Sequence, residues 1–206
     1  MSDHFDDRAA TWDDDPTRVA RAAEIADQIK ERVRPATSAD VLDFGSGTGL
    51  LGFEFLPHVG SVTFADTSEG MLQQVAAKLE AGAHTGGRTL RLDPDALALP
   101  HSYDAVVSLL TLHHVADPVG ALRLLADHVT PGGWLAVCDL DTEDGTLHDD
   151  PDMDVHHGFD RHSLIGLMEE LGFGDVQANT AFVMHRERPE GERPYPLFLL
   201  TAQKPA

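Results

Sequence analysis

The chain has 206 residues and a hydrophobic fraction of 42%, which indicate one folded domain with a substantial core. Its 15 basic and 35 acidic side chains give a formal charge of −20, which argues against binding of nucleic acid through its phosphates. The single cysteine, Cys138, excludes an intramolecular disulfide framework. No apolar run reaches membrane-spanning length and the N-terminus is acidic, so we expect a cytoplasmic monomer or homodimer with a small-molecule partner.

Apolar spacing predicts that helices and strands alternate along most of the chain. The expected helices cover about residues 17–34, 68–81, 118–129 and 160–171, and Ser68 is expected to cap the second of them. The expected strands cover residues 41–44, 61–65, 88–92, 103–109 and 134–140. Strands that alternate with helices are typical of βαβ crossovers, so we predict an α/β, doubly wound, mostly parallel Rossmann-like sheet.

The C-terminal part of the chain interrupts this alternation. Residues 176–184 and 197–203 are two further strand-like runs, and the charged residues 185–196 between them have no helical pattern. Such a connection predicts an antiparallel hairpin at the sheet edge, which completes seven strands with one antiparallel strand. We find no repeat or linker, so residues 1–206 are predicted to form one domain, with N-terminal helices over 1–34 and a core over 35–206.

A glycine-rich turn after the first expected strand is the strongest functional signal. In the run Asp43-Phe44-Gly45-Ser46-Gly47-Thr48-Gly49-Leu50-Leu51-Gly52, glycines lie where a strand turns into a helix, so a ligand can approach the backbone. Asp66 ends the next strand, where doubly wound nucleotide-binding folds place a carboxylate on ribose hydroxyls. Gly47, Gly49 and Gly52 satisfy the dinucleotide pattern, which keeps an NAD-dependent oxidoreductase as an alternative. The charge of Asp43 would repel a pyrophosphate and suits a cofactor with a cationic end.

The motifs together resemble the class I S-adenosylmethionine-dependent methyltransferases, in particular the small-molecule branch that includes ubiquinone and menaquinone methyltransferases. The glycine-rich turn matches the family motif D/E-x-G-x-G-x-G, and Asp66 matches its ribose-binding acid. Residues 95–100 look like its D-A-x-x-L-P segment, whose aspartate and alanine meet the adenine edge, and Asp93 is the rival for that role. Residues 131–135 resemble the turn before its fifth strand.

The resemblance implies that S-adenosylmethionine is the cofactor and that a methyl group passes by in-line displacement to a small-molecule acceptor. A non-catalytic S-adenosylmethionine-binding module would carry the same motifs and remains a second alternative. The segment from Phe5 to Trp12 resembles the family's leading helix, so residues 1–34 are expected to form a lid over the cofactor. The cofactor-binding residues implied are Trp12, Asp43, Gly45, Ser46, Gly47, Gly49, Asp66, Thr67, Asp95, Ala96, Ser108 and Leu109.

Two histidine pairs lie where this fold places its ligands. His113 and His114 follow the fourth expected strand, and His156 and His157 precede the helix after the fifth. An imidazole there can accept a proton near neutral pH if the acceptor must lose one. His157 and His113 are therefore the candidate catalytic residues.

Residues 139–160 contain nine acidic residues, three histidines and no lysine or arginine. Metal-dependent catechol-type relatives of the resembled fold carry an acidic ligand just after the fourth strand, where this chain has Leu109 and Leu110. The aspartates at 149, 150, 152 and 154 show no regular ligand spacing. We therefore predict no metal and interpret the stretch as a solvated acidic loop that helps to cover the substrate and favours a cationic amine.

Overall fold

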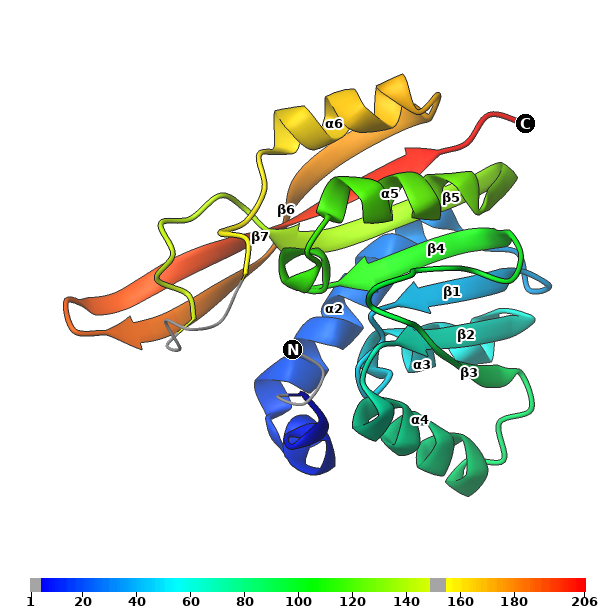
Figure 1. The fold of residues 1–206 in the computed structure, drawn as a ribbon, viewed down its shortest axis with the longest axis horizontal. Helices are drawn as coiled ribbons and strands as arrows, with labels where there is room; N and C mark the ends of the chain where they lie inside the picture. Colours follow the sequence, from blue (N-terminus) through cyan, green and yellow to red (C-terminus); the bar gives the residue numbers. More distant parts are fainter. Residues whose placement is uncertain (1–4, 149–154) are drawn as a thin grey trace.

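The computed structural model describes residues 5–148 and 155–206, and among these it contains one seven-stranded sheet with helices on both faces (Figure 1). The strand order is β3-β2-β1-β4-β5-β7-β6. Strand β7 is antiparallel to both β5 and β6, and the other pairs are parallel. The predicted fold class, including one antiparallel strand near the C-terminal edge, is confirmed. The strands are β1 (Asp40–Phe44), β2 (Ser61–Asp66), β3 (Gly87–Arg91), β4 (Tyr103–Leu109), β5 (Val129–Leu140), β6 (Gly174–Arg188) and β7 (Gly191–Gln203).

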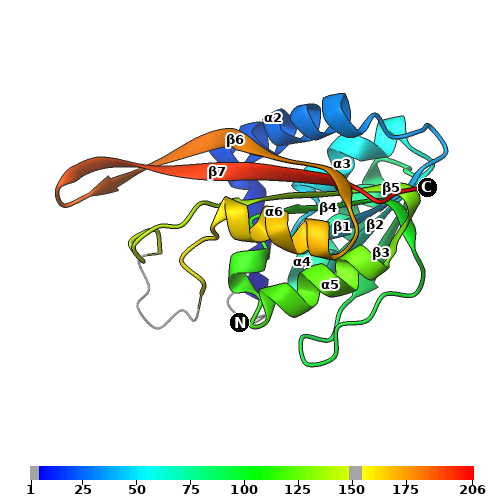
Figure 2. The ribbon, with the colours of Figure 1, turned by 90° about the horizontal axis from the view of Figure 1, so that it is seen from above.

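Helices α2, α3 and α4 cover one face of the sheet, and α5 and α6 cover the other (Figure 2). The Ser68 hydroxyl accepts a hydrogen bond from the N–H of Met71, which confirms its predicted role as the cap of α4. No helix in the described ranges is both long and apolar enough to cross a membrane. The helical elements are η1 (Ala9–Asp14), α2 (Pro16–Val33), α3 (Leu50–Phe55), η2 (Leu56–His58), α4 (Glu69–Ala81), η3 (Leu112–His114), α5 (Pro118–Asp127) and α6 (Arg161–Glu170).

Strand β1 lies in the middle of the sheet and contributes to the hydrophobic cores on both faces. Val41 belongs to the same buried cluster as Ile25 of α2 on one face, and Leu42 belongs to the same buried cluster as Leu125 of α5 on the other. All four of these side chains are fully buried. Because neighbouring residues of a strand point to opposite faces, a strand that is covered on both sides must be apolar at consecutive positions. This is why residues 41–44 could be recognised as a buried strand.

The C-terminal hairpin is longer than the sequence indicated. Residues 185–196 were expected to form a loop, but β6 continues to Arg188 and β7 begins at Gly191, so most of them are paired. The outer part of this hairpin projects away from the body of the protein as a two-stranded ribbon (Figure 2). Since solvent reaches both sides of such a ribbon, its strands do not need the apolar alternation from which strands are predicted.

The N-terminal segment is only partly the expected leading helix. Its regular portion is the short 3₁₀ helix η1, and α2 starts as a separate helix because the Asp15 side chain accepts from the N–H of Thr17 and Pro16 follows. The rings of Phe5 and Trp12 still meet edge to face, with centroids 5.9 Å apart. The predicted aromatic pair therefore forms without a continuous helix.

Candidate active site

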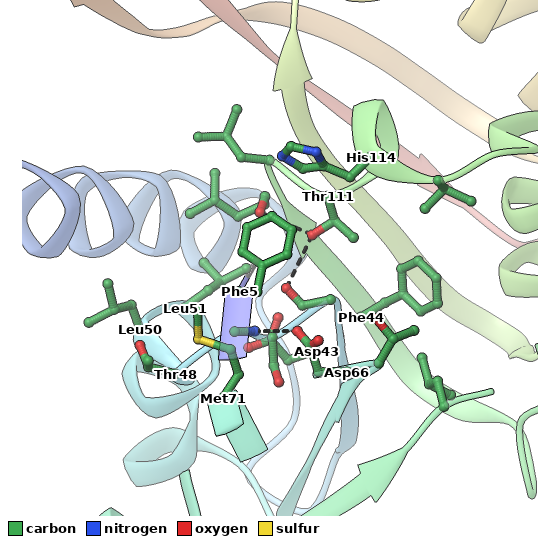
Figure 3. A pocket seen from close by; sticks show the side chains of 18 of the residues that line it. Phe5, Asp43, Phe44, Thr48, Leu50, Leu51, Asp66, Met71, Thr111 and His114 are labelled. Atoms are coloured by element: carbon green, nitrogen blue, oxygen red, sulfur yellow. Dashed lines mark hydrogen bonds between the residues drawn. The ribbon is translucent and has the colours of Figure 1, made fainter. Parts of the chain in front are cut away.

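A cavity of about 400 Å³ lies at the carboxyl ends of β1, β2 and β4 (Figure 3). This is the edge of a doubly wound sheet at which ligands are expected, and the volume is within the range of small-molecule sites. The N-terminal segment and α2 form the remaining wall. The predicted cofactor-binding residues that line the cavity are Trp12, Asp43, Gly45, Ser46, Gly47, Asp66, Thr67, Asp95 and Leu109.

Three other predicted cofactor residues do not line the cavity. The Ser108 hydroxyl is buried and donates to the carbonyl oxygen of Phe44 at 2.9 Å, so it links β4 to β1. Gly49 has a φ of +87° and is the N-terminal cap of α3. Ala96 is exposed in a turn. Ser108 and Gly49 therefore hold the elements beside the cavity in place, whereas Ala96 has no such role in the structure.

Gly45 and Gly47 of the glycine loop have no side chain for two different structural reasons. Gly45 has a φ of +68°, and a Cβ there would lie 2.7 Å from the Cβ of Thr111. Gly47 has a φ of +53°, but its nearest neighbour would be the sulfur of Met71 at 4.0 Å. The space beside Gly47 belongs to the cavity, so the absence of a side chain at this position leaves room for a ligand.

Two aspartates form the floor of the cavity, and Figure 3 shows them close together. Asp66 accepts hydrogen bonds from the N–H of Gly47 at 2.7 Å and from that of Ser68 at 2.8 Å. Asp43 accepts from the N–H of Gly52 at 2.9 Å. Burial, with a smaller contribution from the charge of Asp66, raises the pKa of Asp43 to about 7 against the opposing effect of the Gly52 N–H. Burial also raises the pKa of Asp66 against its backbone hydrogen bonds. Both carboxylates would be stabilised by a cationic ligand.

We expect the affinity for S-adenosylmethionine to rise about tenfold between pH 6 and pH 8, because a cation is bound best when Asp43 is ionised. In Asp43→Asn the side chain still accepts from Gly52, but the titrating charge is absent. Calorimetric titrations of both proteins across this pH range should show a steeper rise for the wild type. Equal slopes would contradict the role of Asp43.

The raised pKa of Asp43 also affects the stability of the protein without ligand. The folded state holds the Asp43 proton more tightly than the unfolded chain does, since the pKa is raised on folding. The contribution of this group to the free energy of unfolding therefore falls as the pH rises from about 4 to about 7. In chemical denaturation, Asp43→Asn should lack this part of the pH dependence.

The segment before α2 is bound to the elements that form the floor. Asp6 accepts from the N–H of Gly70 at 2.8 Å, and Asp13 accepts from the Thr48 hydroxyl at 2.5 Å and forms an ion pair with Lys78. The ring of Phe5 lies between the two aspartates of the floor and the imidazole of His114 in the view of Figure 3. This arrangement is compatible with a cover over the cavity.

The histidines are arranged differently from the expectation. His113 is 3% exposed and lies 2.6 Å from Asp139, and neither it nor His157 lines the cavity. His157 is exposed and lies beside Gly145, whereas His114 does line the cavity. The position of His114 after β4 was a usable signal, but the sequence could not show which histidine of the pair points inward.

Apart from Phe5 of the predicted lid segment and His114 of the predicted histidine pair, the other lining residues were not predicted as site residues from the sequence. They come from α2, from the segment after β3 and from the turn after β4, and only their position at strand ends or on one helical face could have indicated them. Leu110 has a φ of +53°, a strained conformation for a side chain of this kind and one that is common at functional sites. The additional residues are Phe5, Arg18, Arg21, Ala22, Phe44, Thr48, Leu50, Leu51, Met71, Leu92, Pro94, Leu97, Leu110, Thr111, His114, Val115 and Ala116.

The acidic stretch is only partly a solvated loop. Asp139 is fully buried at the end of β5, and Asp141 forms an ion pair with Arg161 of α6. The aspartates at 149, 150, 152 and 154 lie outside the described residues. The sequence predicts exposure for Asp139 and Asp141 because aspartate is usually exposed. Their partners, His113 and Arg161, are distant in the sequence, so the pairing could not be recognised from it.

Comparisons with known proteins find similarity in the part of the chain that forms the cofactor side of the cavity. Residues 42–135, which hold the glycine loop, Asp66 and the turn after β4, match the family model described as "Methyltransferase domain". Together with the relatives and the solved structure described next, this match supports the resemblance to the class I S-adenosylmethionine-dependent methyltransferases. The recognised family and its cofactor, S-adenosylmethionine, are those predicted from the motifs, and the NAD-dependent alternative is set aside.

The individual relatives match only part of this chain. A ubiquinone biosynthesis O-methyltransferase of Nitrosospira multiformis is 35% identical over 47% of this chain and 41% of its own length. An uncharacterized methyltransferase of Mycobacterium tuberculosis is 36% identical over 54% of this chain and 55% of its own. The chain thus spans about half the length of these curated relatives. The structure of DhpI in complex with SAH superposes with a TM-score of 0.73 at 19% identity, covering 100% of this chain and 95% of the other.

Proposed function

We propose that this chain transfers a methyl group to a small-molecule acceptor by in-line displacement. The observation that carries the proposal is that one cavity contains both the predicted cofactor residues and a second group of side chains that the cofactor motifs do not account for. Gly47, Asp66 and Asp95 belong to the first group, and Arg21 and His114 belong to the second. When bound, S-adenosylmethionine supplies an activated methyl group on a sulfonium centre.

The residues present fit that cofactor. The open space beside Gly47 allows close approach to the backbone, Asp66 offers a carboxylate for hydroxyl groups, and Asp43 offers a buried negative charge. Residues 5–33 would cover the bound cofactor, since Asp6 and Asp13 bind α4 and the glycine loop. Enclosure of donor and acceptor in one cavity can contribute roughly 7–11 kcal/mol to catalysis through alignment alone.

If the acceptor must lose a proton, His114 is the imidazole placed to accept it. Its ring lines the cavity, whereas His113 is buried against Asp139 and His157 is exposed beside Gly145. A general base must be able to reach the proton that it removes. We therefore transfer the proposed role of base from His157 and His113 to His114.

Arg21 indicates the charge of the acceptor. Its Nη1 donates to the sulfur of Met184 at 3.0 Å, while its Nε is buried and has no hydrogen-bond partner among the described residues. Burial lowers the pKa of this guanidinium, and it forms no ion pair with any described residue. A partly buried guanidinium without an ion-pair partner among the described residues, in the wall of a binding cavity, is stabilised by an anionic ligand. We therefore expect an acceptor with a carboxylate or a similar anionic group.

The test is transfer of a labelled methyl group from S-adenosylmethionine to matched acceptors: hydroxylated aromatic carboxylic acids, the corresponding amides, and amines. We expect methylated product from the acids, and Arg21→Met should raise their KM at least about tenfold while leaving that of the amides unchanged. Turnover of amines alone would instead support the prediction from the acidic stretch. Cofactor binding without product from any acceptor would favour the non-catalytic module.

A further inference from the structure

Three imidazoles gather at the edge of the cavity. His113 and His114 belong to η3 after β4, and His148 belongs to the segment after β5. The ring centroids are 4.0 Å apart for His113 and His114, and 5.4 Å apart for each of the two pairs with His148. One ring nitrogen from each residue lies within 4.8 Å of those of the other two. Three potential nitrogen ligands therefore surround a common point.

Asp139 fixes the orientation of the most buried member. Its Oδ1 lies 2.6 Å from the Nδ1 of His113, and the carboxylate also accepts from the N–H of Leu112 at 2.9 Å and of Leu140 at 2.8 Å. A fully buried carboxylate held in this way requires the proton of His113 on Nδ1. The lone pair of His113 is then on Nε2. Histidines that bind a metal through one ring nitrogen usually donate the other N–H to such a carboxylate.

The chemistry of the cluster favours a particular class of ion. Neutral imidazole nitrogens suit zinc and neighbouring transition metals, whereas magnesium and calcium prefer oxygen ligands. Nitrogen ligands at tetrahedral zinc lie roughly 3.3 Å apart, as follows from zinc–nitrogen distances of about 2.0–2.1 Å. The separations in this cluster can close to that value by side-chain rotation, because His114 and His148 are only partly buried.

We propose that His113, His114 and His148 together bind one divalent transition-metal ion of the zinc class, with Asp139 as a positioning residue. Because His114 also lines the cavity, an ion held there would lie beside the space in which we place the acceptor. The sequence-based expectation of no metal considered Leu109, Leu110 and the spacing of the aspartates. It did not consider histidines that the fold brings together from two strand ends.

The experiment uses the full, untagged chain after removal of bound metal with a chelator. Calorimetric titration with zinc chloride should show one equivalent bound per chain, and cobalt(II) should give the intense visible absorption of a tetrahedral site. In His148→Ala the zinc affinity should fall at least about a hundredfold. His157→Ala is the matched control, because this exposed histidine lies in the same part of the chain but outside the cluster, and it should bind zinc like the wild type.

Asp139→Asn tests the positioning role, with an expected loss of about 10–100-fold in zinc affinity. Circular dichroism of each variant separates loss of metal from loss of fold, and His148→Ala alone decides the proposal if Asp139→Asn is unfolded. Absence of saturable zinc binding, or equal binding by His148→Ala, would overturn the site. Zinc binding without methyl transfer would retain it, so its failure is distinguishable from failure of the proposed function.

Discussion

Replacement of Asp66 by alanine is expected to weaken S-adenosylmethionine binding by roughly 100-fold or more. A carboxylate that accepts two hydrogen bonds from ligand hydroxyls contributes about 3 kcal/mol, which corresponds to that factor. The variant also removes the acceptor for the N–H groups of Gly47 and Ser68, so the glycine loop loses one hydrogen bond and the turn before α4 loses another. The measurement is calorimetric titration with S-adenosylmethionine, S-adenosylhomocysteine and NAD.

Asp27→Ala is the control for this experiment. Asp27 is an exposed carboxylate on α2 whose one ion pair with the described residues is with Lys30 of its own helix, so its removal should leave all three titrations unchanged. Binding of NAD with an affinity that depends on Asp66 would contradict the cofactor assignment. Equal affinity of Asp66→Ala and the wild type for S-adenosylmethionine would show that this carboxylate does not hold the ligand.

The second large effect is expected for Gly47→Ala, which should abolish measurable cofactor binding while leaving the protein folded. Its new methyl group meets no atom closer than the Met71 sulfur at 4.0 Å, so the cost to the fold is the positive φ of +53°, about 1–2 kcal/mol. That corresponds to a decrease in Tm of roughly 3–6 °C. The same methyl group projects into the space where the ligand must approach the backbone.

Gly132→Ala provides the matched variant. Gly132 has a φ of +78°, a Cβ added there would meet no atom within 4 Å, and the residue does not line the cavity. The substitution should lower Tm by a similar amount with no change in cofactor affinity. If both variants bind S-adenosylmethionine equally well, the glycine at position 47 serves only the backbone conformation.

The cofactor half of the site could be predicted because the residues that form it lie close together in the sequence. Asp43 lies near the end of β1, Gly47 lies in the turn that follows, and Asp66 ends the next strand, so a single βαβ unit brings them together. The parallel pairing of β1 with β2 guarantees that these ends lie at the same edge of the sheet. Resemblance to a known motif and the physical argument from strand ends therefore indicated the same residues.

The histidine half could not be predicted in the same way. His113, Asp139 and His148 come from different segments, and their relation depends on how far β5 extends and how the chain returns after it. No periodicity or spacing records that Asp139 points into the protein. The acidic surroundings in the sequence instead suggested a solvated loop, although a carboxylate at the end of a central strand is buried by its neighbours.

The outer edge of the sheet has a consequence for behaviour in concentrated solution. Strand β6 forms one of the two edges of the sheet, and its pairing with β7 shifts register between Gly174 and Gln177 and again between Thr180 and Phe182. Bulges of this kind twist an edge and interrupt its row of hydrogen-bonding groups, and the charged residues 186–188 surround those groups with water. A neighbouring chain therefore finds no flat edge to extend, and the long projecting ribbon resists the lateral aggregation to which an exposed strand is otherwise prone.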